Sequence, residues 1–527
     1  MAKVSANVSD NGLKRKLIDA VSSKTGMKKE NIRNLEIVKK SIDARKKPEI
    51  FYVFSVRIWT DSFPKKLLNN RDVTFLKDVK KYSFEENGEE ILSNRPVIVG
   101  FGPAGMFCAL MLAEYGYKPM VLERGMQVDK RIECIEEFWK NGILNPDSNV
   151  QFGEGGAGTF SDGKLNTSVS DKQLRNQFVL ETLVKFGAGE DILYDAKPHI
   201  GTDILSVIVK NIREYIISKG GEVRFETKVT DFLIENNKVK GVVVNETETI
   251  ESDAVVLAIG HSARDTFEKL YNLGFAMEPK PFAVGVRVEH LQKDIDDVMY
   301  GKNHSEVLPP SPYKLTGKTN DGRAVYSFCM CPGGYVVNAS SEERRMVVNG
   351  MSYSDRTGEN ANSAIVVAVS PEDYNATNPI DGVKFQRELE KKAYEEGKGK
   401  IPVQRYGDYV ERIITSEFGK VKPNTKGNYN MADINNIFPD FINDAIKESI
   451  ERFSRNIHGF NDKDTVISAV ESRTSSPLRI IRDDDFVSVN YGGLYPCGEG
   501  AGYAGGITSA AIDGIKVFEA IAKKYRH

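Results

Sequence analysis

One glycine-rich segment constrains the fold of this chain more than any other feature. The apolar run 96–99 predicts a buried strand, and Gly100, Gly102 and Gly105 follow it in the spacing G-x-G-x-x-G. In this pattern the first glycine makes a tight turn, the second lets the backbone approach a pyrophosphate, and the third lets a helix pack closely on the strand. Residues 103–114 predict that helix, whose N-terminal N–H groups and dipole would face the phosphates.

The residues after this helix complete the pattern. Gly116 suits the end of the helix, residues 119–122 predict a second strand, and Glu123 follows that strand. A carboxylate at this place accepts hydrogen bonds from ribose hydroxyls. A glycine-rich turn without a ligand would explain the glycines but not the ordered series of strand, loop, helix, strand and glutamate. The segment therefore predicts an α/β domain that binds a dinucleotide, and it leaves the choice between FAD and NAD open.

Composition limits the setting in which this domain works. The chain has 527 residues, which predicts two or three domains, and its 72 Lys and Arg against 74 Asp and Glu give no general attraction to nucleic acid or membrane. Five cysteines are an odd and sparse set, which does not indicate a disulfide framework. We see no apolar signal sequence and no apolar run of about 18 residues. A cytoplasmic protein with no membrane span is expected.

The first 93 residues are predicted to form a separate small α+β module. Apolar residues at helical spacing predict a helix over 13–21, and β-branched and aromatic residues predict a strand over 50–58. The polar stretch 84–90 is interpreted as a linker. The module, residues 1–93, therefore precedes the dinucleotide domain.

The rest of the chain is predicted to be a dinucleotide domain interrupted by an insertion. Its first part spans 94–285 and its last part 490–527, and a β-rich α+β substrate domain occupies 286–489. Short apolar runs predict strands and an apolar period predicts helices in these segments: strands over 254–260 and 363–369, helices over 385–390 and 510–518.

Two further glycine-rich motifs favour FAD over NAD. Residues 151–165, Q-F-G-E-G-G-A-G-T-F-S-D-G-K-L, are too rich in glycine for a plain helix or strand. Residues 495–510, Y-P-C-G-E-G-A-G-Y-A-G-G-I-T-S-A, resemble the late flavoprotein motif in which a Gly–acid pair binds the ribityl chain and a helix N-terminus faces the flavin. Flavoproteins of the glutathione reductase type carry Asp in that pair, whereas this chain has Glu499.

Together these segments resemble the family of FAD-dependent dehydrogenases, also called NAD(P)/FAD-dependent oxidoreductases. Further matching motifs are F-C-M-C-P-G-G at 328–334, N-G-M-S at 349–352, G-E-N-A-N at 358–362 and E-S-R-T-S-S-P at 471–477. The resemblance covers about 95–527 and extends more weakly through the N-terminal module. It implies the fold class α/β, with a Rossmann-like, glutathione-reductase-like FAD domain, the inserted β-rich domain and the small N-terminal module. It does not supply a substrate.

The resemblance also implies where FAD is held. Val229 is where such flavoproteins touch adenine through the backbone, although an ordinary strand valine explains it equally well, and Gly260 ends a strand that passes near the cofactor. The expected cofactor-binding residues are Gly100, Gly102, Pro103, Ala104, Gly105, Glu123, Arg124, Gly155, Gly156, Gly158, Lys164, Val229, Gly260, Gly498, Glu499, Gly505, Gly506 and Ile507.

Four side chains are candidates for catalysis, each with a structural alternative. Cys329 and Cys331 would share one face of a strand, so both thiols would point at one space; packing is favoured over a redox dithiol, because a disulfide at this spacing would be strained. Lys164 would stabilise a reduced flavin anion or lie on the surface, and Arg473 would clamp an anionic substrate or form a salt bridge. A structural role is favoured for His261 over proton donation. With six histidines and no tight ligand cluster, no metal site is expected.

These observations predict flavin-dependent oxidation or reduction of a small molecule by hydride transfer. We find no convincing second dinucleotide fingerprint, so either NADH or NADPH approaches the flavin directly as a transient donor and competes with the substrate, or another reductant serves. Two alternatives stay open: a flavin-dependent RNA-modifying enzyme, with the basic segment 41–47 near RNA, and a non-catalytic flavin-binding scaffold or sensor. No nucleic-acid or membrane partner is expected, and the sequence leaves the oligomeric state open.

Overall fold

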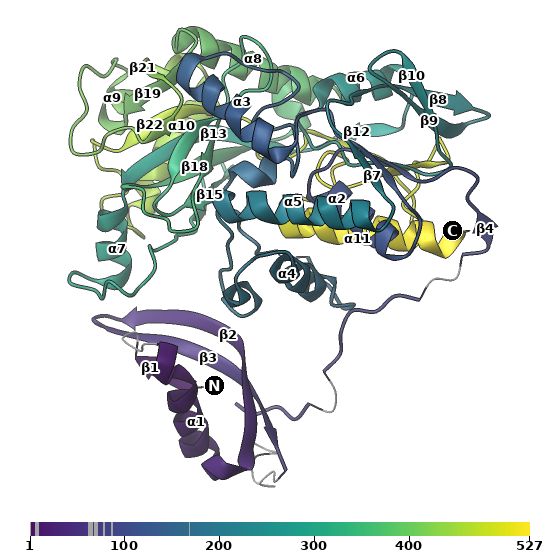
Figure 1. Ribbon diagram of the computed structural model, residues 1–527. Helices are drawn as coiled ribbons and strands as arrows, with labels where there is room; N and C mark the ends of the chain where they lie inside the picture. Colours follow the sequence, from purple (N-terminus) through teal and green to yellow (C-terminus); the bar gives the residue numbers. More distant parts are fainter. Residues whose placement is uncertain are drawn as a thin grey trace.

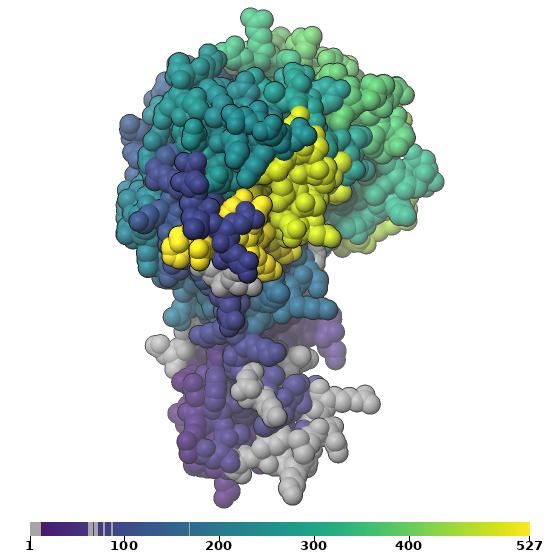
Figure 2. Space-filling view, turned by 90° about the vertical axis from the view of Figure 1, so that its right-hand side faces the viewer, coloured from purple at the N-terminus to yellow at the C-terminus, as the bar shows by residue number. Residues whose placement is uncertain are grey.

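The computed structural model describes residues 2–5, 10–61, 67, 72–76, 79–85, 88–167 and 169–527 of the chain. It shows a small N-terminal module beneath a large body, and Figure 2 shows the module as a separate lobe (Figure 1; Figure 2). The body contains a five-stranded parallel sheet and a seven-stranded mixed sheet. The predicted α/β class, with a Rossmann-like domain and a β-rich domain, is confirmed.

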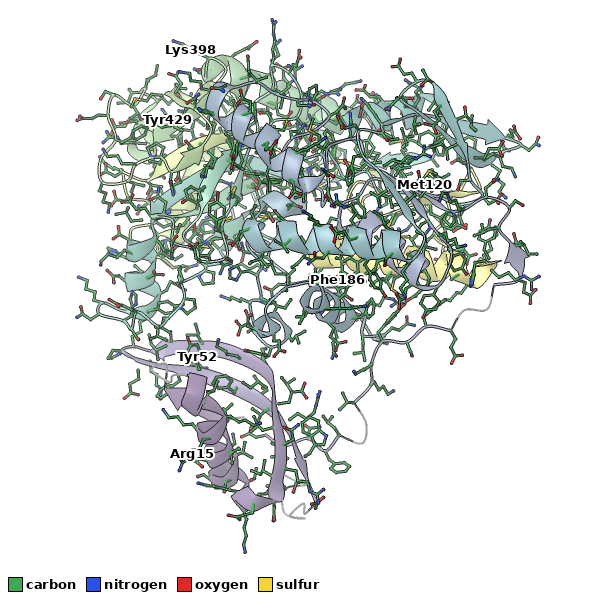
Figure 3. The ribbon with its side chains drawn as sticks, in the orientation of Figure 1. Arg15, Tyr52, Met120, Phe186, Lys398 and Tyr429 are labelled. Atoms are coloured by element: carbon green, nitrogen blue, oxygen red, sulfur yellow. The ribbon has the colours of Figure 1, made fainter. Side chains whose placement is uncertain are left out.

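The N-terminal module is a three-stranded antiparallel sheet with one helix. Its elements are β1 (Ala2–Ser5), α1 (Asp10–Thr25), β2 (Ile32–Lys46) and β3 (Glu49–Thr60), with strand order β1-β3-β2. Leu17 on α1 and Phe54 on β3 belong to one core, and Tyr300 and Leu308 of the body complete it. Figure 3 shows Tyr52 on the part of the module nearest the body and Arg15 on its helix (Figure 3). The helix and strand predicted over 13–21 and 50–58 lie within α1 and β3.

The parallel sheet forms the centre of the second domain. In order its strands are β24 (Leu494–Pro496), β11 (Val255–Leu257), β5 (Val97–Val99), β6 (Met120–Leu122) and β7 (Glu222–Arg224). The helices packed on one face are α2 (Pro103–Glu114), α4 (Arg175–Lys185), α5 (Thr202–Ser218) and α11 (Ile507–Lys524) (Figure 1). Two more helices follow strands of this sheet: α3 (Val128–Asn141) and α6 (Arg264–Asn272).

Alternation along these short strands explains the layers. Ile98 and Val121 belong to the core shared with the helices, whereas Val97, Val99 and Leu122 belong to the core on the opposite face. Successive residues of a strand point to opposite faces, so an unbroken apolar run indicates a sheet covered on both sides. Burying each such side chain contributes about 1.5–3 kcal/mol. The second cover is the antiparallel sheet of β8 (Val229–Glu235), β9 (Lys238–Val244) and β10 (Glu248–Glu251).

The β-rich domain, called the cap here, is built on the seven-stranded sheet. Its strands are, in order, β14 (Thr316–Lys318), β15 (Ala324–Cys331), β18 (Asn360–Val369), β13 (Phe282–Leu291), β22 (Val466–Glu471), β19 (Ile401–Arg405) and β21 (Tyr429–Met431). Its helices are α7 (Gln292–Tyr300), α8 (Asp381–Glu396), α9 (Tyr406–Glu411) and α10 (Asp440–Phe453). A smaller sheet contains β16 (Tyr335–Asn338), β17 (Val348–Met351) and β20 (Thr425–Lys426).

The chain enters and leaves the cap through one two-stranded ribbon. This ribbon pairs β12 (Met277–Pro279) with β23 (Leu478–Ile480), directly before the first cap strand and after the last. A similar pair, β4 (Glu90–Ile91) with β25 (Tyr525–Arg526), fixes the start of the body to its C-terminus. Of the predicted linker 84–90, residues 86–87 lie outside the described residues, and Phe84 packs edge-on against Phe518. Among the described residues, no helix has both the length and the apolar character needed to cross a bilayer.

Candidate functional site

A cavity of about 740 Å³ lies between the parallel-sheet domain and the cap. Residues from the loops after β5, β6 and β11 line one side, and residues of β15 and β17 line the other. In a parallel α/β sheet the carboxyl ends of the strands are the usual place for a ligand, and ligand pockets of about 300–1,000 Å³ are typical. The cavity therefore has the position and the size of a ligand site.

The three fingerprint glycines differ in their surroundings. Gly100 has φ +97°, which favours glycine, and makes the turn after β5. A Cβ on Gly105 would lie 2.0 Å from the carbonyl oxygen of Gly100, so this glycine lets α2 pack on the strand. A Cβ on Gly102 would meet only the Cα of Gly156, at 3.8 Å, and Gly102 lines the cavity. The turn, the close packing and the open approach thus fall on the glycines that the motif predicts.

Two helix N-termini open onto this cavity. Gly102 precedes α2 without a side-chain cap, and Gly506 precedes α11, where Ser509 Oγ accepts hydrogen bonds from the amides of Gly505 and Gly506. No atom lies within 4 Å of the position that a Cβ would take on Gly260 or Gly505. The N-terminal amides of α2 and the positive ends of both helix dipoles suit phosphate oxygens and a polarised ring carbonyl. The open backbone and these amides form a cradle that fits a dinucleotide such as FAD.

Glu123 is buried at the base of this cradle. Its carboxylate accepts hydrogen bonds from the backbone amides of Phe101 at 2.8 Å and of Gly125 and Gly153 at 2.9 Å. One carboxylate therefore joins the loop after β5, the loop after β6 and the glycine-rich loop. Glu123 also lines the cavity. Its contact with ribose hydroxyls stays a prediction.

The buried Arg131 shapes the glycine-rich segment 151–165. Its guanidinium donates to the carbonyl oxygens of Asn149 at 2.9 Å, Val150 at 3.0 Å and Glu154 at 2.7 Å, and it stacks on Phe160. Burial lowers the pKa of Arg131 to about 10, so the group stays charged at neutral pH. The sequence gives no sign of this role for Arg131, because its partners are backbone carbonyls, which carry no sequence signal.

Asp513 and Arg482 anchor the late glycine motif. The Asp513 carboxylate accepts from the amide of Gly498 at 2.7 Å and from both terminal nitrogens of Arg482. A Cβ on Gly498 would lie 2.6 Å from that of Ala104, which shows close packing against α2. The neighbouring Glu499 has a different partner from Asp513, since its Oε1 lies 3.1 Å from Nδ1 of His261. Asp513 is a charged residue in the middle of a helical apolar pattern, and this is the feature of the sequence that could have indicated its role.

Most of the predicted cofactor-binding residues line the cavity. Those that do are Gly100, Gly102, Pro103, Ala104, Glu123, Arg124, Gly156, Gly158, Lys164, Val229, Gly260, Glu499, Gly505, Gly506 and Ile507. Gly105, Gly155 and Gly498 lie behind the lining, where each lets backbone or side-chain atoms approach closely. Arg124 stacks on Phe152 and pairs with two aspartates at the same wall.

The structure corrects the expectation for the two cap cysteines. The pairing of β15 with β18 sets Phe328 opposite Ala364 and Cys331 opposite Asn362, so the strand contains a bulge between Phe328 and Cys331. Cys329 lies in this bulge with φ +42°. The bulge breaks the two-residue alternation, so the thiols do not share a face: Cys329 lines the cavity, whereas Cys331 is buried and outside the lining.

Both thiols are free and unfavourable for ionisation. Burial raises the pKa of Cys331 despite the nearby Lys164. Although Cys329 is open to the cavity, the atoms packed around it raise its pKa to about 12. A thiol is nucleophilic as its thiolate, so neither cysteine is prepared for attack at neutral pH.

Arg287 holds this part of the cap in place and was missed by the sequence analysis. It is fully buried, pairs with Glu471 at 3.0 Å, and donates to the side-chain oxygen of Asn362 at 2.6 Å and the carbonyl oxygen of Cys329 at 3.2 Å. It lies between Val286 and Val288, so it was visible in the sequence as a charged residue where a core residue is expected. Its contacts fix the bulge and therefore the position of Cys329.

Arg473 belongs to a buried ion cluster between the two domains. Its guanidinium pairs with Glu390 of α8 at 3.1 Å and also contacts Ser262. Glu390 pairs in addition with Arg264 of α6 at 2.7 Å. Arg473 therefore forms a salt bridge, which was the structural alternative to clamping a substrate. Its side chain also lines the cavity.

Comparisons with known proteins agree with this geometry. Residues 281–474 match the family described as FAD-dependent protein, C-terminal domain-like, and residues 6–59 match a domain of unknown function. A protein of Clostridium beijerinckii, described as "Uncharacterized protein", is 48% identical over 511 residues, which cover 96% of this chain and 95% of that protein.

Solved structures that match this chain include a glycine oxidase and an L-proline dehydrogenase. Glycine oxidase from Bacillus cereus ATCC 14579 has a TM-score of 0.35 and 14% identity, covering 81% of this chain and 94% of that chain. L-proline dehydrogenase from P. horikoshii has a TM-score of 0.33 and 12% identity, and the match covers 83% of this chain and 94% of that chain.

Proposed function

The chain belongs to the family of FAD-dependent proteins whose C-terminal domain it carries at residues 281–474, and on that premise we propose that it is an enzyme that oxidises or reduces a small molecule at its FAD. FAD is the cofactor of this family. When bound, FAD supplies hydride-transfer chemistry that side chains lack. The task of the chain is then to hold the cofactor, orient the substrate and exclude water.

The observation that carries the proposal is the continuity of the cavity. One end is formed by the glycine loop and the N-terminus of α2, and the other by side chains of the cap, including Phe328, Cys329 and Asn349. A protein that only binds FAD needs only the end formed by the glycine loop and α2. A second wall of mixed apolar and polar side chains beyond the cradle supports a second ligand in contact with the first.

The domain interface supports a fixed site. Arg264, Arg473 and Glu390 are all buried where α6 meets α8, and a buried pair resists separation because each lone charge would be desolvated. The cap therefore stays on the parallel-sheet domain, and small molecules enter through the mouth of the cavity.

NADH or NADPH is the proposed electron donor, and it would enter the same cavity. Among the described residues there is a single five-stranded parallel sheet, and its fingerprint loop belongs to the FAD cradle. The related glycine spacing at 153–158 leads into the short 3-10 helix Ala157–Phe160, which offers no comparable helix dipole. Donor and substrate would therefore bind in turn.

Anaerobic titration of the FAD-loaded protein with NADH and NADPH tests the proposal. We expect one of the two to bleach the flavin absorbance with a stoichiometry of one per FAD, and steady-state rates to give parallel double-reciprocal lines. A flavin that dithionite reduces but neither nucleotide does would contradict the nicotinamide donor. A flavin that no reductant reduces would contradict the enzyme and favour a scaffold.

A further inference from the structure

The cap end of the cavity is rich in positive charge. The cationic side chains there are Lys164, Lys197, Lys314 and Arg356. Among the described residues that line the cavity, Asp162 is the carboxylate that lies with them. Lys197 and Lys314 are exposed, but both line the cavity, so this end of the cavity presents an excess of positive charge to an entering molecule.

Asp162 cannot balance these charges. Its Oδ2 accepts from Lys164 Nζ at 2.7 Å and from Arg356 at 2.6 Å, and its Oδ1 accepts from the Ser352 hydroxyl. Burial alone would raise the pKa of Asp162, but Lys164 and Arg356 lower it, so the carboxylate stays charged. It is nonetheless one negative charge shared by two cations, and both of its oxygens are occupied.

The backbone brings Lys197 to the same end of the cavity. Lys164 and His199 form an antiparallel bridge, and the side-chain amide of Asn166 donates to the carbonyl oxygen of Ala196 at 3.1 Å. The segment that carries Lys197 therefore runs alongside the segment that carries Lys164.

Lys314 approaches from the cap. The next residue, Leu315, exchanges hydrogen bonds with Ser327 of β15, since its amide donates to Ser327 Oγ at 2.8 Å and its carbonyl accepts from the Ser327 amide at 2.8 Å. Lys164 Nζ also donates to the carbonyl oxygen of Met330 on the same strand. Lys314 of the cap and Lys197 of the parallel-sheet domain thus both line this cavity, as Lys164 does.

Lys197 and Lys314 make no ion pair or side-chain hydrogen bond with any residue in the described part of the chain. Other cations of the lining differ from them: Arg124 and Arg473 are each paired with carboxylates. Lys197 is exposed, and burial of part of its side chain lowers its pKa. Two unpaired ammonium groups in the lining of one cavity favour an anionic ligand.

We propose that the substrate is a small organic acid whose carboxylate binds between Lys197 and Lys314 and whose apolar part lies against Phe328. The inference rests on the proposed function, because it places the substrate of that reaction. It assigns the recognition of the substrate to two lysines that no sequence motif includes. Lys164 and Arg356, held by Asp162, keep the surrounding field positive.

Calorimetric titration of the FAD-loaded protein with sodium benzoate, and with neutral benzamide as its isostere, tests the proposal. We expect saturable binding of benzoate and none of benzamide. Lys197→Met and Lys314→Met, which keep the apolar stem, should each weaken benzoate binding at least about tenfold. Lys318→Met is the matched control: this exposed lysine lies at the end of β14, outside the cavity, and its loss should leave the affinity unchanged.

Four outcomes would overturn the proposal without touching the proposed function. Equal binding of benzoate and benzamide, or equal affinity in the lysine variants, would remove the anion site. Binding of inorganic phosphate without binding of benzoate would assign the site to a phosphate-bearing ligand. Loss of FAD from Lys197→Met or Lys314→Met would show that the charges serve the cofactor. Failure of the proposed function is separate, since it would show as a flavin that no reductant reduces.

Discussion

Gly102 and Gly156 face each other at the base of the cavity. A Cβ on Gly156 would lie 2.9 Å from the Cα of Gly102, whereas a Cβ on Gly102 meets protein only at 3.8 Å. The glycine at 102 is therefore required by a ligand more than by the protein. The sequence predicted this role because the fingerprint spacing is a property of consecutive residues.

Gly102→Val should abolish FAD binding and leave the fold intact. The branched side chain would fill the space that the pyrophosphate needs, while the protein leaves room for the Cβ itself. We expect FAD occupancy to fall at least about tenfold with an unchanged circular dichroism spectrum. Gly12→Val, in a helix of the N-terminal module with no neighbour within 4 Å, is the control. Normal occupancy in Gly102→Val would place the phosphates elsewhere.

Replacing both Cys329 and Cys331 by serine should change turnover less than about threefold. The bulge separates the two thiols, and their surroundings raise both pKa values, so neither a dithiol nor a thiolate is available. FAD content and flavin reduction should be unaffected. Loss of turnover in a variant whose flavin is still reduced by the donor would restore a chemical role for these thiols.

At the scale of elements, the sequence predicts the features that depend on local pattern and does not predict those that depend on contacts between distant residues. The strand over 254–260 was predicted from a short apolar run and lies at β11, and the helices predicted over 385–390 and 510–518 lie at α8 and α11. The bulge at Cys329 was not predicted, because it is set by the pairing of β15 with β18 and by Arg287 behind it. The same holds for the lysines of the cap end, which meet only in the folded chain.

Glu390→Gln should destabilise the junction of α6 and α8 strongly. Burial alone would raise the pKa of Glu390, but the guanidinium groups of Arg264 and Arg473 hold it well below its usual range. Removing the carboxylate leaves the buried Arg264 and Arg473 with only Glu342 as an anionic partner, and breaking a buried pair in this way costs about 3–5 kcal/mol. Glu388→Gln, at an exposed position of the same helix, should cost less than about 0.5 kcal/mol. Equal stability of the two variants in urea unfolding would contradict this account of the cluster.

At the scale of the whole molecule, the N-terminal module contacts both domains that enclose the cavity. The amide of Lys40 donates to the carbonyl oxygen of Tyr194 at 2.7 Å, and that of Ala196 donates to the carbonyl oxygen of Lys40 at 2.8 Å. Leu308 of the cap completes the core of the module. The sequence predicted the module from its own periodicity, but backbone contacts of this kind leave no mark on the sequence.

Leu308→Asp should release the module from the body. A carboxylate placed in that core would lose its hydration without gaining a partner. We expect hydrogen exchange at the amides of Lys40 and Ala196 to speed up at least about tenfold, measured by mass spectrometry of the peptides that contain them. Val307→Asp is the control, because the Val307 side chain is 60% exposed. Unchanged exchange in Leu308→Asp would mean that the module is held by other contacts.

The identity and amount of the bound cofactor test the central claim most directly. The purified protein should be yellow, and chromatography of the material released by heat should find FAD at one equivalent per chain. The cradle formed by the glycine loop, the N-termini of α2 and α11 and the open space at Gly505 predicts this result. Only FMN, only NAD, or no cofactor after attempted reconstitution with FAD would contradict it.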